Sequence, residues 1–181
     1  ISNARQRGYD VLLMDSPLDM HFINMIEHKL GNASFARVDS DTIDKLVLKE
    51  ESTISKINED EKNKLKEIIE RSVPKEKFHV NFEALTADDM PFIIVQPEFM
   101  RRMKDMAAIG GGMPFMGTYP EIYNLVVNTN NDFMLKVLNE ADETKQNDLV
   151  KQFFDLAKLA QNLLKGEELT GFIKRSITLI K

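Results

Sequence analysis

The chain has 181 residues, of which 43% are hydrophobic and 29% are charged, as is typical of a globular protein. Its net charge of −5 argues against a nucleic-acid partner, which a basic face would bind. Because cysteine is absent, disulfides, thiolate metal sites and cysteine nucleophiles are excluded, and a reducing cytoplasm is a suitable location. No apolar run approaches the roughly 20 residues of a membrane-spanning helix, and no signal-peptide core is visible, so we expect no membrane partner.

The first fifty residues predict a βαβ unit. Tyr9–Met14 has the apolar composition of a buried strand, and a helix is expected to begin after Ser16 and to end at Gly31. Ser34–Val38 and Thr42–Leu46 are short extended candidates that complete the unit. The helix places its apolar side chains on one face: Leu18, Phe22, Met25, Ile26 and Leu30.

Composition then changes to a highly charged stretch, Lys49–Lys66, which predicts a domain boundary between residues 1–48 and 49–181. A helix is expected near Glu59–Ser72, ending before Pro74, and another over Asn131–Glu140. The apolar pattern predicts three strands between these helices, the first of them antiparallel: Phe78–Leu85, Phe92–Val95 and Ile122–Val127.

A short helix is expected from about Pro97 to Ile109, followed by the glycine-rich loop Gly110–Gly117. Six of the ten methionines lie between Met90 and Met116. Methionine side chains are flexible and polarizable, which suits a surface that accepts many apolar shapes. The competing interpretation is that these methionines belong to the chain's own core. The residues predicted to contact a client or partner are Phe99, Met100, Met103, Met106, Met113, Phe115 and Met116.

Two closing helices, separated at Gly166, carry more apolar surface than one short chain can bury. A second apolar stripe (Val150, Phe154, Ala157, Leu164) runs beside the first on the earlier helix, so its apolar face is wide. Such a patch usually marks a partner surface, and a second copy would complete a four-helix bundle. The competing interpretation is that both helices cap the chain's own sheet. The residues predicted to form the dimer interface are Leu149, Phe153, Leu156, Ala160, Leu163, Leu169, Phe172, Ile173, Ile177 and Ile180.

Candidate catalytic and metal-binding residues are few. His21 and His28 lie seven residues apart, whereas metal-binding pairs usually show i, i+4 spacing and need a third ligand, so ordinary helix histidines are favoured. His79 is expected on the solvent face of its strand. The run Gly110–Gly112 follows a helix, and no Lys and Ser or Thr come after it as in a phosphate loop, so a flexible loop is favoured. We therefore predict no catalytic, cofactor-binding or metal-binding residue.

Four sets of residues, in order along the chain, carry a family pattern: Gly8–Met14 with Pro17-Leu18-Asp19, Leu85-Thr86 with Pro91 and Val95, Met100–Lys104, and Leu125–Asn128. Together they resemble the heat-shock protein 90 chaperones, in the bacterial form called HtpG, from about Gly8 to Ile180. The chain departs from the family at Thr129–Asp132, which replace a Pro-x-His-Pro segment, and at Met20 and Arg101, which replace acidic residues.

The resemblance implies a fragment that comprises the end of a middle domain (residues 1–48) and a C-terminal dimerisation domain (49–181). The tripeptide Ser2-Asn3-Ala4 resembles the scar of a cleaved expression tag, although it can equally be native. ATP and Mg would bind parts of the parent that are absent here, so this fragment would hold no cofactor and would not be an enzyme. The implied partners are a second copy and unfolded or partly folded client proteins in a bacterial cytoplasm. The acidic tail that recruits tetratricopeptide co-chaperones is missing.

The expected fold class is α+β. A short βαβ segment precedes a small antiparallel or mixed sheet with helices, and a C-terminal helix pair forms a dimeric four-helix bundle. We predict the dimerisation and client-contact region of an ATP-dependent chaperone. Two alternatives remain open: a small-ligand or phosphate-binding enzyme domain that uses the glycine loop, and a plain dimeric adaptor whose methionines are core. Nucleotide binding by this chain would favour the first, and methionines packed inside the protomer would favour the second.

Overall fold

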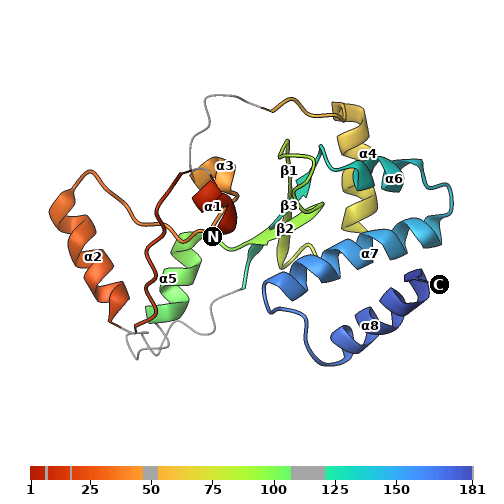
Figure 1. Ribbon diagram of the computed structural model, residues 1–181. Coiled ribbons are helices and arrows are strands. Elements are labelled where there is room, and N and C mark those ends of the chain that lie inside the picture. The colour runs from red at the N-terminus through yellow and green to blue at the C-terminus, as the bar shows by residue number, and fades with distance from the viewer. Residues whose placement is uncertain (7, 17, 47–52, 107–120, 181) are drawn as a thin grey trace. The chain divides into compact units, whose positions relative to one another are not determined.

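A computed structural model describes residues 1–6, 8–16, 18–46, 53–106 and 121–180 (Figure 1). The chain forms two units, one of Ile1–Lys49 with Val95–Glu121, and one of Glu50–Ile94 with Ile122–Lys181. The assignment of residues 1–48 and 49–181 to two domains of a chaperone stays a prediction. Within the described ranges, no helix has both the length and the apolar character needed to cross a membrane.

The first unit is helical. Its helices are α1 (Ser2–Gln6), α2 (Asp19–Leu30), α3 (Ile43–Leu46) and α5 (Glu98–Met106). The predicted end of α2 is confirmed, because Gly31 adopts a left-handed conformation (φ 65°) and its N–H donates to the Glu27 carbonyl at 3.0 Å. At the start of α2, the Ser16 hydroxyl accepts from the Leu18 N–H at 3.2 Å, while the Asp19 carboxylate accepts from the Ser16 N–H at 2.8 Å. This reciprocal pair stabilises the turn that precedes the helix, whose N-cap position is Leu18.

The βαβ prediction for the first fifty residues is wrong. Residues 9–14 and 34–38 form no strand, and Ile43–Leu46 is the helix α3. Leu12 and Leu13, predicted inside a buried strand, are 68% and 75% exposed. A strand requires a neighbour that pairs with its backbone N–H and C=O groups, and the described strands, all beyond residue 77, pair with one another instead. In α3 the hydrogen bonds are local, because the Thr42 carbonyl accepts from the N–H groups of Lys45 and Leu46.

The second unit contains a small mixed sheet with the order β1-β3-β2. Its strands are β1 (Phe78–Glu83), β2 (Phe92–Val95) and β3 (Tyr123–Asn128), close to the predicted positions. The antiparallel assignment of the first strand is wrong, because β1 runs parallel to β3 with Phe78 opposite Tyr123 and Glu83 opposite Asn128. Parallel neighbours need a long crossover connection, and the chain between β1 and β3 is long enough to supply one.

The second unit also contains helices α4 (Glu59–Glu70), α6 (Asp132–Asn139), α7 (Glu143–Ala160) and α8 (Gly166–Ile180), and the predicted helices are confirmed. Asn58 and Glu61 form a capping box at the start of α4, and Asn131 and Asp142 cap α6 and α7. Figure 1 shows α7 lying along the sheet and α8 folding back beside α7. The core between α4, the sheet and α7 contains side chains with no exposed surface: Leu65, Ile69, Leu125, Val127 and Val150. The mixed α/β architecture is confirmed, and the dimeric four-helix bundle stays a prediction.

Candidate functional site

Metal-binding chemistry finds no support in the part of the chain that the structure describes. No group of three or more His, Cys, Asp or Glu residues in that part could hold a metal ion. His21 and His28 on α2 are exposed, and His79 on β1 is exposed as predicted. All three histidines therefore lie on the surface, and the absence of a metal-binding role stays a prediction.

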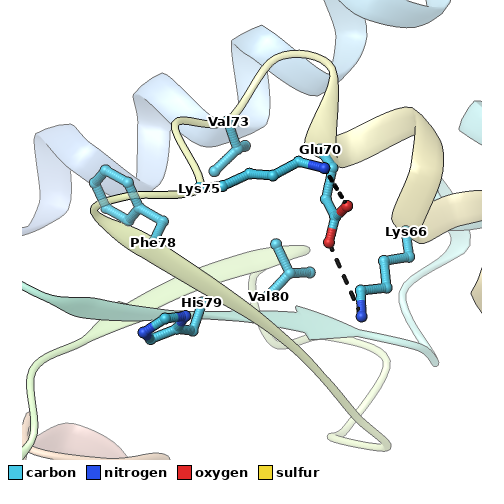
Figure 2. A pocket seen from close by; sticks show the side chains of 7 residues that line it. All are labelled: Lys66, Glu70, Val73, Lys75, Phe78, His79 and Val80. Carbon is cyan, nitrogen blue, oxygen red and sulfur yellow. Dashed lines mark ion pairs between the residues drawn. The ribbon is translucent and has the colours of Figure 1, made fainter.

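A shallow cavity of about 170 Å³ lies in the second unit, where α4 meets β1 (Figure 2). The Glu70 carboxylate accepts a hydrogen bond from the Lys75 ammonium at 2.7 Å and lies 3.9 Å from the Lys66 ammonium. The hydrogen bond from Lys75 holds the pKa of Glu70 below its usual range. Both lysine side chains are more than half exposed, and an anion entering the cavity would compete with Glu70 for them. The cavity therefore offers neither a general base nor a free anion site.

Arg102 attaches α5 to the rest of the first unit. Its guanidinium binds the Glu27 carboxylate of α2 at two points, at 2.7 and 3.0 Å, and donates to Glu98 at 2.9 Å and to the Phe35 carbonyl at 2.6 Å. The Arg102 hydrogen bond, helped by one from the Phe35 N–H, lowers the pKa of Glu27 to about 2. The arginine side chain is 21% exposed. Arg102 is thus a structural anchor between α2 and α5.

The predicted client-contact residues occupy different surroundings on α5. Phe99 is 69% exposed, whereas Met100 and Met103 are half-buried. The side chain of Met106 and all of Met113, Phe115 and Met116 lie outside the described residues. Neighbouring Arg101 pairs with Asp39 of the same unit at 2.6 Å, so both arginines of α5 bind within their unit. The role of the methionines stays a prediction.

The two apolar stripes predicted on α7 differ in burial. The second stripe is almost fully buried, with Val150, Phe154, Ala157 and Leu164 between 0% and 4% exposed, and three of these four residues belong to the core of the unit. In the first stripe, Phe153 is buried, Ala160 is exposed, and three half-buried leucines pack against the same core: Leu149, Leu156 and Leu163. Much of the wide apolar face of α7 therefore covers the chain's own sheet.

The predicted interface residues of α8 are more accessible. Phe172 is buried and Leu169 is half-buried, whereas Ile173 and Ile177 are 50% and 54% exposed. The side chain of Ile180 lies outside the described residues. Leu159 of α7, which the sequence reasoning did not select, is 41% exposed. The helix pair thus exposes large apolar side chains mainly from α8.

Sequence reasoning also missed a polar cluster between the closing helices, which we call the α7–α8 cluster. It consists of Gln152, Asp155, Lys158, Glu168, Arg175 and Ser176. The Arg175 guanidinium contacts the Asp155 carboxylate at 2.5 Å and the Gln152 side-chain oxygen at 3.2 Å, and Gln152 donates to the Ser176 hydroxyl at 2.8 Å. Lys158 lies 2.8 Å from Glu168 and 3.7 Å from Asp155. Asp155 and Lys158 are 5% and 7% exposed, so these charges are buried even in a single protomer.

A weak signal for this cluster is present in the sequence. Gln152, Asp155 and Lys158 recur every three residues between apolar neighbours, which places polar groups on one side of an otherwise apolar helix. Their partners could not be identified, because the pairing depends on how α8 packs.

A buried polar turn joins the end of β3 to the segment that departs from the family pattern. Asn128 at the end of β3, and Asn130 and Asn131 in the departing segment, are between 0% and 9% exposed. Their amide groups donate to the carbonyl oxygens of residues 86, 85 and 89, at 2.8, 3.0 and 2.9 Å. The Asn131 side-chain oxygen also accepts from the Phe133 N–H and caps α6. These hydrogen bonds tie the turn to the loop after β1 and satisfy buried polar groups.

No family model matches the chain, whereas several bacterial chaperones match nearly all of it. The chaperone protein HtpG of Porphyromonas gingivalis (strain ATCC 33277) is 40% identical over 171 residues, which cover 93% of this chain and 24% of that protein. The HtpG proteins of Bacteroides fragilis (strain 638R) and Bacteroides thetaiotaomicron are 33% and 31% identical over 247 residues, which cover 99% of this chain and 36% of each relative.

This chain therefore spans only 24% to 36% of the length of these relatives. The regions aligned in the two Bacteroides proteins are longer than the chain, so these relatives hold residues there that have no counterpart here. The similarity confirms the resemblance to the bacterial HtpG type of the heat-shock protein 90 family, of which the chain matches a part.

Proposed function

We propose that this chain is the dimerisation and client-contact region of an ATP-dependent chaperone. The observation that carries the proposal is the match of 93% to 99% of the chain to proteins named as HtpG chaperones. All of these relatives bear a chaperone name, which disfavours both the phosphate-binding enzyme domain and the plain adaptor. ATP and Mg binding, and hydrolysis, are assigned to other parts of the parent in a bacterial cytoplasm.

A second copy is the proposed partner of the α7–α8 helix pair. Leu159, Ile173 and Ile177 are each 41% to 54% exposed on one pair of helices. Full burial of one such side chain contributes about 1.5–3 kcal/mol. Two copies related by a two-fold axis would cover these residues in a four-helix bundle, with α8 forming most of the seam. In the parent, a dimer of this kind would hold the ATP-binding arms at a high effective concentration.

Client contact is proposed for α5 and the methionine-containing segment that follows it in the sequence. Phe99 offers an exposed aromatic ring, and Arg101 and Arg102 hold the helix in place through ion pairs with Asp39 and Glu27. Apolar segments of an unfolded protein would bind such side chains without a specific sequence. Two copies in one dimer would strengthen the contact through avidity.

The proposal is tested by comparing two charge substitutions in the second unit. Ile177→Glu places a carboxylate in the proposed seam, whereas Ile54→Glu changes an isoleucine that is 87% exposed outside the helix pair. Binding to a fluorescently labelled, permanently unfolded polypeptide is measured by anisotropy. We expect Ile177→Glu to be monomeric and to bind about tenfold more weakly because avidity is lost. Ile54→Glu should bind as the unmodified chain does. Equal client binding by both variants would refute the proposal.

A further inference from the structure

We propose that the α7–α8 cluster fixes the rotation of α8 about its own axis and thereby selects the apolar side chains that meet the second copy. The inference rests on the proposed function, because it assigns the specificity of the proposed dimer to a polar cluster in which Asp155 and Lys158 are buried and Glu168 is exposed. Its partner is a second copy of this chain.

The cluster constrains α8 at several points along its length. Glu168 in the first turn pairs with Lys158, and Arg175 and Ser176, about two turns later, bind Asp155 and Gln152. At about 100° per residue, the cluster residues of α8 and Phe172 share one side of the helix. Ile173 and Ile177 lie roughly 100° and 140° further round than Phe172, and Leu169 lies between them and Phe172. Contacts about two turns apart therefore set the axial register and the rotation.

Apolar packing alone would not produce this orientation. Among the described side chains of α8, only Phe172 is buried, while Ile173 and Ile177 remain half-exposed. Because apolar attraction is non-directional, a rotation of α8 that exchanges Phe172 for Ile173 and Ile177 against α7 would retain apolar burial in an isolated protomer. Such a rotation would separate Arg175 from Asp155 and leave this buried carboxylate with the longer contact to Lys158, at 3.7 Å, which is unfavourable.

Buried ion pairs are suited to this role. Replacing both partners by apolar residues is often neutral or stabilising, so such pairs contribute more to the choice of one arrangement than to overall stability. Asp155 and Arg175 have side chains that are 6% and 16% exposed, whereas the Arg71–Glu143 pair, which also involves α7, is 46% and 71% exposed. The exposed Arg71–Glu143 pair therefore serves as a control, because it links α7 to the end of α4 and not to α8, and so has no part in fixing the rotation of that helix.

The test uses the absence of cysteine, which allows a single spin label in each copy of the 181-residue chain. The label is attached through Lys174→Cys, at an exposed position of α8 outside both the cluster and the seam. Double electron–electron resonance then measures the label-to-label distance within the dimer. Three forms are compared: the unmodified cluster, Asp155→Leu with Arg175→Leu, and the control Arg71→Leu with Glu143→Leu.

The unmodified cluster and the control should give one narrow distance distribution. In the Asp155→Leu, Arg175→Leu form, the buried Lys158 keeps its ion pair with Glu168 at 2.8 Å, so helix content and melting temperature should be retained. The distance distribution should become broad or shifted, and the dimer dissociation constant should rise about tenfold or more. If that form does not fold, Gln152→Met with Ser176→Ala, which removes the uncharged half of the cluster, should give the same broadening. An unchanged distribution and dissociation constant would overturn the role of the cluster alone. A monomeric unmodified chain would overturn the proposed dimer, and this inference with it.

Discussion

Arg102 is the residue that fixes the arrangement of helices α2 and α5 in the first unit. Its planar guanidinium binds Glu27 at two points and reaches both Glu98 and the Phe35 carbonyl. A lysine could not reproduce this set, because an ammonium group has no planar fork of donors. Each contact is a charge-assisted hydrogen bond in a partly buried position, where such bonds are strongest.

Replacing Glu27 by glutamine should destabilise the first unit by about 2 kcal/mol near neutral pH. The pKa of Glu27 is lowered from 4.5 to about 2 in the folded chain, so its ionised form stabilises the fold above pH 4.5. That contribution decreases as the pH falls from 4.5 through 2. The difference between Glu27→Gln and the unmodified chain should therefore shrink over this range, as measured by urea denaturation at several pH values.

Asp10→Asn is the control for this measurement, because Asp10 is an exposed carboxylate in the same unit. It should leave the midpoint of unfolding nearly unchanged. A Glu27→Gln variant whose destabilisation is the same at pH 7 and at pH 2 would contradict the assigned role of Glu27.

Helix α2 packs against α5 through its polar side, and its apolar side is therefore exposed. Glu27 turns its side of α2 toward α5, and the apolar residues Leu18, Phe22 and Met25 are 72%, 48% and 50% exposed. A helix with this pattern usually buries its apolar side. The first unit thus exposes apolar side chains on α2 as well as Phe99 on α5.

Phe99→Ser on α5 should weaken binding to an unfolded polypeptide by about threefold to tenfold, because an aromatic contact is removed. It should leave the melting temperature nearly unchanged, because Phe99 is 69% exposed. The matched control is Leu12→Ser, which removes an apolar side chain of similar exposure, 68%, from the same unit. Equal weakening by both variants, measured by fluorescence anisotropy, would mean that α5 has no special role in client contact.

The sequence predicted the helices well where one residue decides the boundary. Gly31 ends α2 with a positive φ, and Gly166, which also has a positive φ (59°), begins α8. The direction of β1 could not be predicted, because parallel pairing with β3 depends on residues more than forty positions away. The strand over Tyr9–Met14 failed for a related reason, because apolar composition does not supply a pairing partner.

The candidate site was predictable only in part. The apolar spacing on α8 led to Ile173 and Ile177, which are exposed as a partner surface requires. It did not reveal that Leu149 and Leu156 pack against the chain's own core, because burial on a wide apolar face depends on the neighbouring elements. The pairing of Asp155 with Arg175 likewise arises only when α8 packs against α7.

The whole chain is proposed to act without chemistry of its own. We expect calorimetric titration with Mg-ATP to give no saturable heat, because none of the described strands is followed by a glycine loop, a Lys and a Ser or Thr at the start of a helix. The glycine run Gly110–Gly112 lies outside the described residues. Micromolar binding that disappears when these glycines are replaced would restore the enzyme interpretation.

The solution mass of the unmodified chain is the decisive measurement, because both the proposed dimer and the avidity of client binding depend on self-association. A seam that resembles a protein core cut in half should be stable at micromolar concentration. Sedimentation velocity over a concentration series should therefore show a species of roughly twice the chain mass of 20.8 kDa, with little dissociation. A single species of 20.8 kDa throughout the series would contradict the account.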